Sequence, residues 1–183
     1  MFNFEELDKK TRSYMLLEFK LEIESNNPYR SKNLLDGGWK MFPKIMEKAI
    51  NEGNEETLAK ELNNQTYWKT SGERKNKKTG KITYFKIRPE IAAKELAQTE
   101  FNTWYVRGLS KRLIDEGVKS CQVYRAAPAQ NPRVECCEYE DKIFNVENVY
   151  SGHRKRYWPE PGNIEAFSIP CGPNCHHTIR RYQ

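Results

Sequence analysis

The C-terminal third of the chain holds most of its metal-binding residue types but shows no long periodic element. Four of the five cysteines and all three histidines lie after residue 126. A segment so rich in loops has little apolar surface to bury, and apolar residues make up only 37% of the whole chain, against about 45–50% in a typical globular domain. The C-terminal third therefore needs a cross-link to hold its fold.

The cellular compartment decides whether disulfides or a metal supply that cross-link. No apolar run approaches the ~20 residues that a membrane helix needs, and residues 1–5, Met-Phe-Asn-Phe-Glu, do not begin a signal peptide. We therefore expect a protein kept in a reducing cytoplasm, away from membranes. In that compartment, clustered Cys and His residues favour a metal site over a disulfide framework.

Residues 170–177, Pro-Cys-Gly-Pro-Asn-Cys-His-His, supply one half of a candidate zinc site. Zinc takes four Cys or His ligands in tetrahedral geometry, commonly as two closely spaced pairs. Cys171 and Cys175 form such a pair across a turn that contains Gly and Pro. His177 lies two residues further on and is an alternative to Cys171 in this pair.

Residues 135–138, Glu-Cys-Cys-Glu, supply the other half. Adjacent cysteines seldom both reach one ion without strain, so we expect Cys136 to bind and Cys137 to pack as a small apolar side chain. A catalytic zinc would need an open coordination position and a general base, for which Glu135 or Glu138 would have to serve. We expect a structural zinc and no catalytic residues. The alternative without metal is a set of buried thiols with surface histidines.

Residues 67–88 predict a basic β-hairpin, because β-type residues stand at both ends of a turn sequence at 76–80. Eight Lys and Arg residues lie in or beside it, against the single acid Glu73. Such a hairpin suits contact with phosphates; the alternative is a solvated turn that Lys keeps soluble. The predicted nucleic-acid-binding residues here are Lys69, Arg74, Lys75, Lys77, Lys78 and Lys81.

A second basic and aromatic patch, His-Arg-Lys-Arg-Tyr-Trp, spans residues 153–158. Positive charges interleaved with rings suit phosphate contact and base stacking, which makes Arg154, Lys155 and Arg156 further predicted nucleic-acid contacts. The alternative is an exposed loop whose rings pack back on the core.

Apolar residues at helical spacing predict helices over residues 4–25 and 39–52, and Asn54 opens a short third helix with a capping pattern. The strongest helical pattern runs over residues 90–116, with Pro89 at its first turn. A short strand follows at 121–125.

Glycines lie at two places in the predicted helical segments. Gly37-Gly38 is expected to break the chain before the second helix, and Gly108 marks a kink or a close helix contact inside the long one. The predicted fold is α+β: N-terminal helices over 1–66, the basic hairpin over 67–88, and a region over 89–183 in which one long helix packs on a small loop-rich β region stapled by the Cys/His cluster.

The second half of the chain resembles the C-terminal domain of phage minor head morphogenesis proteins, the Mu F-like family. That pattern begins on a helix, where residues 97–102 (Ala-Gln-Thr-Glu-Phe-Asn) match, and runs to a Gly-Val step at 117–118. A strand and a Cys-containing stretch follow, where Cys136 takes the place of the second Cys of the family's Cys-x-x-Cys and Phe144 matches the Phe of a hairpin. Pro170 and residues 173–177 correspond to its closing segment.

Two positions depart from the family pattern. Arg133 stands where the family has its first Cys, and Asp141 stands where it has a Gly. Either Cys171 replaces the lost ligand or the metal site is altered. The ligand set that the resemblance implies is Cys136, Cys171, Cys175 and His177.

The resemblance implies a non-enzymatic phage protein that acts in capsid assembly or DNA packaging, located in the virion or the host cytoplasm. Its partners would be the portal or major capsid protein and, through the basic segments, DNA. The alternative is a small phage-encoded inhibitor that binds a host defence nuclease or its nucleic acid, which the net charge of +6 permits. A zinc-dependent hydrolase or nuclease is the third hypothesis.

Overall fold

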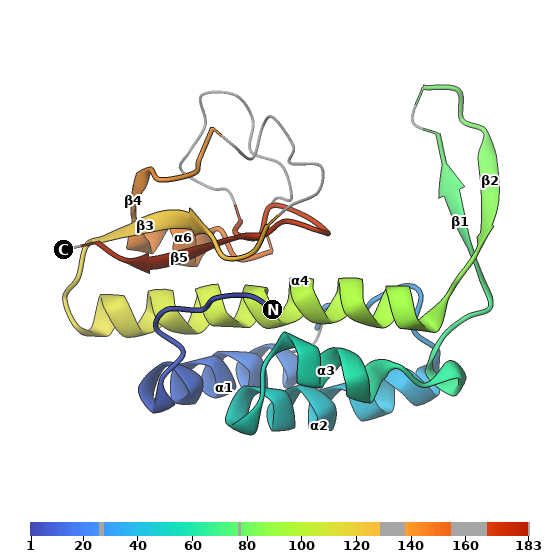
Figure 1. The fold of residues 1–183 in the computed structure, drawn as a ribbon, viewed down its shortest axis with the longest axis horizontal. Helices are drawn as coiled ribbons and strands as arrows, with labels where there is room; N and C mark the ends of the chain where they lie inside the picture. Colours follow the sequence, from blue (N-terminus) through green and yellow to red (C-terminus); the bar gives the residue numbers. More distant parts are fainter. Residues whose placement is uncertain (26–27, 77, 129–137, 155–167, 183) are drawn as a thin grey trace.

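One long helix, α4 (Pro89–Asp115), organises the fold, and the other elements lie along it (Figure 1). The computed structural model describes residues 1–25, 28–76, 78–128, 138–154 and 168–182. Within them the chain is α+β, with a layer of helices on one side of α4 and a small antiparallel sheet on the other. None of the described helices is long and apolar enough to cross a membrane.

The helical layer packs against α4 through fully buried side chains. Met15 and Phe19 face α4, and the Phe19 ring lies edge-on to Trp104, with ring centroids 5.2 Å apart. Asn54 caps the third helix through its side-chain oxygen, as its sequence pattern predicts. The elements of this layer are α1 (Lys9–Ile23), α2 (Asp36–Glu52), α3 (Glu55–Leu62) and the short 3-10 helix η1 (Gln65–Tyr67).

Two helix starts differ from the sequence prediction. The first helix begins at Lys9 and not at residue 4, because Asp8 caps it by accepting a hydrogen bond from the Thr11 amide. Phe4 is buried beside Tyr105 in the segment before the helix, with ring centroids 4.6 Å apart. The predicted break at Gly37-Gly38 is wrong: α2 begins at Asp36 and includes both glycines.

The sheet layer has the strand order β4-β3-β5, with both pairs antiparallel. Val123 and Ile179 belong to the large buried core cluster that also contains residues of α4. The predicted strand at 121–125 is confirmed, whereas the C-terminal strand and the short helix were not expected. The elements are β3 (Ser120–Arg125), β4 (Ile143–Asn145), α6 (Val146–Ser151) and β5 (His177–Arg181).

The predicted hairpin is confirmed as a two-stranded antiparallel sheet, β1 (Ser71–Lys75) and β2 (Ile82–Lys86). It extends from the N-terminal end of α4 and stands clear of the three-stranded sheet (Figure 1). Its strand residues are exposed apart from half-buried Gly72. The core therefore ends where the hairpin begins, at buried Trp68 and Ile87.

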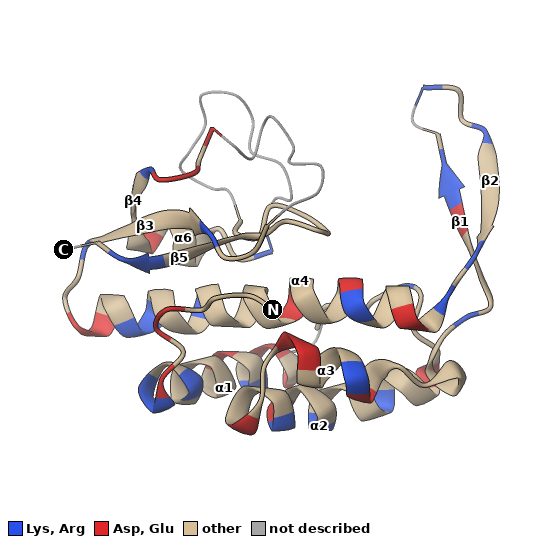
Figure 2. Cartoon of the chain, viewed as in Figure 1, with Lys and Arg blue, Asp and Glu red and all other residues tan. Residues whose placement is uncertain are grey.

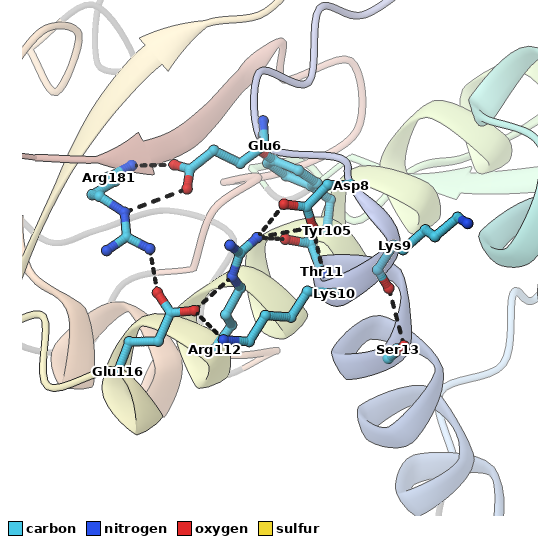
Figure 3. A network of polar contacts seen from close by, with 10 residues as sticks. All are labelled: Glu6, Asp8, Lys9, Lys10, Thr11, Ser13, Tyr105, Arg112, Glu116 and Arg181. Carbon is cyan, nitrogen blue, oxygen red and sulfur yellow. Dashed lines mark hydrogen bonds and ion pairs between the residues drawn. The ribbon is translucent and has the colours of Figure 1, made fainter.

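A polar network ties the two layers together at the other end of α4 (Figure 3). Glu116 accepts hydrogen bonds from Lys10, Arg181 and Arg112. These contacts, in that order, lower the pKa of Glu116 to about 2. Arg112 also contacts both carboxylate oxygens of Asp8, at 2.9 and 2.8 Å. The start of α1, the end of α4 and the last strand thus meet in one network of charges.

Candidate functional site

Three of the four predicted zinc ligands lie together at the start of β5. Cys171 and Cys175 flank a turn in which the Cys175 amide donates to the Gly172 carbonyl at 3.1 Å. Cys175 Sγ lies 3.5 Å from Cys171 Sγ and 3.8 Å from Nδ1 of His177. All three side chains are buried. The fourth predicted ligand, Cys136, lies outside the described residues, as does Cys137.

The two contacts have the spacing of ligands that share one ion. Zn–S bonds of about 2.3 Å and Zn–N bonds of about 2.0–2.1 Å place two sulfur ligands of a tetrahedral zinc about 3.8 Å apart, and a sulfur and a nitrogen ligand about 3.5–3.6 Å apart. The two contacts lie within about 0.3 Å of these separations. Over the described ranges alone, no group of three or more His, Cys, Asp or Glu side chains is placed to hold a metal ion. Zinc therefore remains a proposal, based on these two distances and on the predicted ligand outside the described residues.

A carboxylate orients the imidazole of this group. Nε2 of His177 lies 3.4 Å from Glu140 Oε2, so Nδ1 is left facing Cys175. Arg125 holds Glu140 in turn, with Nη2 2.6 Å from Oε2. The hydrogen bond from Arg125, against an opposing effect of burial, lowers the pKa of Glu140, and His177 adds to the lowering. Metal-binding histidines commonly have such a carboxylate behind them.

Three other residues that invite a metal or catalytic role take no part in this group. Cys121 is buried in β3, where burial raises the pKa of its thiol to about 12, so the thiol is unreactive at neutral pH. The His176 ring lies 2.8 Å from the Pro128 carbonyl through Nδ1. Glu138, considered above as a general base, is exposed, and Glu135 lies outside the described residues.

The basic hairpin holds the excess positive charge of the chain. Residues 69–88 contain eight Lys and Arg residues and one Glu, a net charge of +7, whereas the whole chain carries +6. The rest of the chain is therefore close to neutral, at −1. Figure 2 shows the concentration of Lys and Arg on the hairpin. The predicted contact residues described here, all of them exposed, are Lys69, Arg74, Lys75, Lys78 and Lys81; Lys77 lies outside the described residues.

Arg154, predicted as a nucleic-acid contact, turns inward. Its guanidinium lies between two carboxylates, with Nε 2.8 Å from Glu22 Oε2 and Nη2 2.6 Å from Glu100 Oε2. Burial opposes its charge, but Glu100 and then Glu22 outweigh burial and raise the pKa of Arg154. Its charge is thus neutralised inside the protein. Lys155 and Arg156 lie outside the described residues.

Arg154 belongs to a polar cluster that the sequence reasoning missed. Glu18 is 4% exposed and accepts hydrogen bonds from Arg107 Nε at 2.7 Å and from the Tyr150 hydroxyl at 3.0 Å. Beside it, Glu22 contacts His153 Nε2 at 3.0 Å. These contacts join α1 and α4 to α6 and the turn after it. They line a cleft of about 780 Å³.

A signal for this cluster was present in the sequence. Met15, Glu18, Phe19 and Glu22 recur at the i, i+3, i+4, i+7 spacing that defines one face of a helix. Two acids on an otherwise apolar face need buried partners, because an unpaired buried carboxylate is costly. The spacing alone does not identify those partners, which come from far along the chain.

Comparison with known proteins found no matching family model, no matching curated protein and no matching solved structure. The geometry of the described residues is therefore the main basis for assigning a function.

Proposed function

We propose that this chain is a non-enzymatic phage protein that acts in capsid assembly or DNA packaging through contacts with protein and DNA. The observation on which the proposal rests is the hairpin, which holds a charge of +7 in a chain of net charge +6 and stands apart from the core. The resemblance of the second half of the chain to minor head proteins gives the phage context. The proposed partners are the portal or capsid protein and DNA.

The form of the hairpin supports a contact role. An isolated two-stranded hairpin is marginally stable in water, and this one buries almost none of its side chains. Concentrated positive charge on a projecting arm attracts polyanions at long range. The arm suits binding better than catalysis, because its described cations are exposed.

We also propose that Cys171, Cys175 and His177 hold a structural zinc, with Cys136 as the fourth ligand. Their burial, the two ligand spacings and the Glu140 contact support this. The role of the metal is to hold the Cys-containing turn against β5, in a region whose elements are short. Arg154 is left out of the proposed DNA surface because carboxylates neutralise it.

The location of the protein during infection tests the assembly role. We expect it to co-purify with virions or procapsids. If the protein is recovered only outside virions and procapsids, in complex with a host nuclease, the assembly role is overturned and the inhibitor role is favoured.

The DNA contact is tested separately by the salt dependence of binding. Replacing Lys75, Lys78 and Lys81 with Gln is expected to reduce the slope of log affinity against log salt by about 2–3, because each lost phosphate contact lowers it by about 0.7–0.9. The control is the same charge change at three exposed lysines on the helical layer, Lys20, Lys40 and Lys44. An equal slope for both triple variants rules out the hairpin as the DNA contact.

A further inference from the structure

Positive charge does not account for all of the hairpin surface. Ile82, Tyr84 and Phe85 are 47%, 75% and 44% exposed. A turn that Lys merely keeps soluble has no use for three large apolar side chains in five residues. Contact with the outside of a duplex does not use their apolar surface either, because phosphates are bound by cations and hydrogen-bond donors.

The strand register separates these side chains onto two faces. Phe85 pairs with Gly72, and a Cβ atom at Gly72 would lie 2.6 Å from the tip of the Phe85 ring, so the ring covers the glycine. Tyr84 pairs with Glu73 and therefore lies on the opposite face, together with the pair Ile82 and Lys75. The face that carries Tyr84, here called the open face, presents the most exposed of the three side chains.

This open face forms one wall of a hollow of about 520 Å³. Lys32 and Asn33, from the segment before α2, form the opposite wall. The two walls are joined where the Lys69 amide donates to the Asn33 carbonyl at 3.0 Å. The hollow thus brings Lys32, Lys69 and Lys75 around Tyr84, with Glu73 as the one carboxylate among the lining residues.

We infer that this hollow binds single-stranded nucleic acid, with one unpaired base stacked on Tyr84 and the adjacent phosphates on Lys32, Lys69 and Lys75. The inference rests on the proposed function and specifies which form of nucleic acid the arm takes. Cationic grooves with exposed aromatic rings bind single strands, since every base offers a face for stacking. In a duplex that face is covered by the neighbouring base pairs, so the ring of Tyr84 would find no partner.

The experiment measures the binding of a fluorescent oligothymidylate, and of a duplex of equal length, to the full chain. Single-strand binding is expected to be the tighter of the two. Tyr84→Ala is expected to weaken single-strand binding about five- to 150-fold and to leave duplex binding unchanged. Tyr84→Phe keeps the ring and should bind as the parent does. The control is Tyr182→Ala, which removes an exposed ring at the far end of the chain.

The outcomes separate this inference from the proposal on which it rests. Equal binding of both forms, unaffected by Tyr84→Ala, overturns the single-strand site while the DNA contact of the arm stands. Absence of binding to either form overturns both, and points to an acidic protein as the partner of the arm. Because Tyr84 is exposed and outside the core, the Tyr84→Ala variant should unfold at the same temperature as the parent, which thermal unfolding checks.

Discussion

Gly108 lies at the closest approach of two helices. A Cβ atom built on it would lie 2.6 Å from the backbone nitrogen of Met15 on α1. Gly108→Ala should therefore destabilise the protein by up to about 2 kcal/mol, because separating the helices costs roughly 1–3 kcal/mol and the gain in helix propensity offsets about 1 kcal/mol of this cost. Denaturant unfolding measures the difference. Of the sequence-based alternatives for this glycine, the close contact is the one observed.

The matched control for Gly108 is Gly37, in the first turn of α2. A Cβ atom there meets nothing within 4 Å. Gly37→Ala should leave the free energy of unfolding unchanged or raise it by up to about 1 kcal/mol. If both alanine variants change the free energy of unfolding equally, helix propensity dominates. The contact with Met15 then does not determine the effect of a side chain at position 108.

His153 and Glu22 should make stability depend on pH in two separate ranges. Burial lowers the pKa of His153, partly opposed by Glu22. The folded protein therefore resists protonation of His153. The contribution of the neutral imidazole to stability is complete above about pH 6.5 and falls as the pH drops below this value. Burial raises the pKa of Glu22, but contacts with His153 and Arg154 outweigh it and lower the pKa to about 2. Its contribution is lost only below about pH 4.3.

Thermal unfolding from pH 8 to pH 3 checks both ranges. His153→Gln should flatten the curve between about pH 5 and 7 and leave the acid limb in place. The acid limb should persist in Glu22→Gln as well, though weaker, because Glu116 also titrates at about 2. An unaltered curve between pH 5 and 7 in His153→Gln would mean that the buried imidazole is not the titrating group.

At the scale of the element, the hairpin should be dispensable for folding. The backbones of Thr70 and Ile87 already meet, with the Ile87 amide donating to the Thr70 carbonyl at 3.0 Å. Replacing residues 71–86 with a short Gly-rich turn should change the unfolding temperature by only a few degrees, since none of the described residues in this range is buried. The same variant should lose nucleic-acid binding. A large fall in the unfolding temperature would show that the hairpin supports the core.

The long elements were predictable from the sequence, whereas some of the short ones were not. Residues 90–116 and 67–88 show clear periodicity or turn chemistry, and the structure has α4 and the hairpin there. The strand His177–Arg181 has the sequence His-Thr-Ile-Arg-Arg, without the alternation that marks a strand with one buried face. It is a strand because β3 pairs with it over five residues. That pairing depends on contacts across the chain, which the local pattern does not contain.

The candidate site likewise contains residues that the sequence predicted and a partner that it did not predict. Its predicted ligand residues stood out because Cys and His cluster in few positions, and Cys171, Cys175 and His177 do meet. The partner Glu140 did not stand out, because its role depends on Arg125 and on the pairing of β3 with β5. The sequence shows which residues have metal-binding chemistry, whereas the neighbours that orient their side chains are known only from the fold.

At the scale of the whole molecule, the proposed zinc should stabilise both layers together. The sheet layer joins the N-terminal segment through the Asn3 amide, which donates to the Ala126 carbonyl at 2.8 Å, and through the Tyr124 hydroxyl, which donates to the Asn3 carbonyl at 2.7 Å. The network around Glu116 joins the two layers again at the end of α4. The whole chain should therefore unfold in one cooperative transition, and loss of the metal should lower the temperature of that transition.

Metal analysis of protein purified without chelator should give about one zinc per chain, and Cys175→Ser should lose the metal and much of its stability. Cys121→Ser is the control, since Cys121 is also a buried thiol, in the strand next to β5, but lies outside the proposed ligand group. It should keep its zinc even if the buried hydroxyl lowers the unfolding temperature. Metal-free parent protein, with Cys175→Ser no less stable than Cys121→Ser, would contradict the zinc site. The contact between Cys171 and Cys175 would then be one between buried thiols.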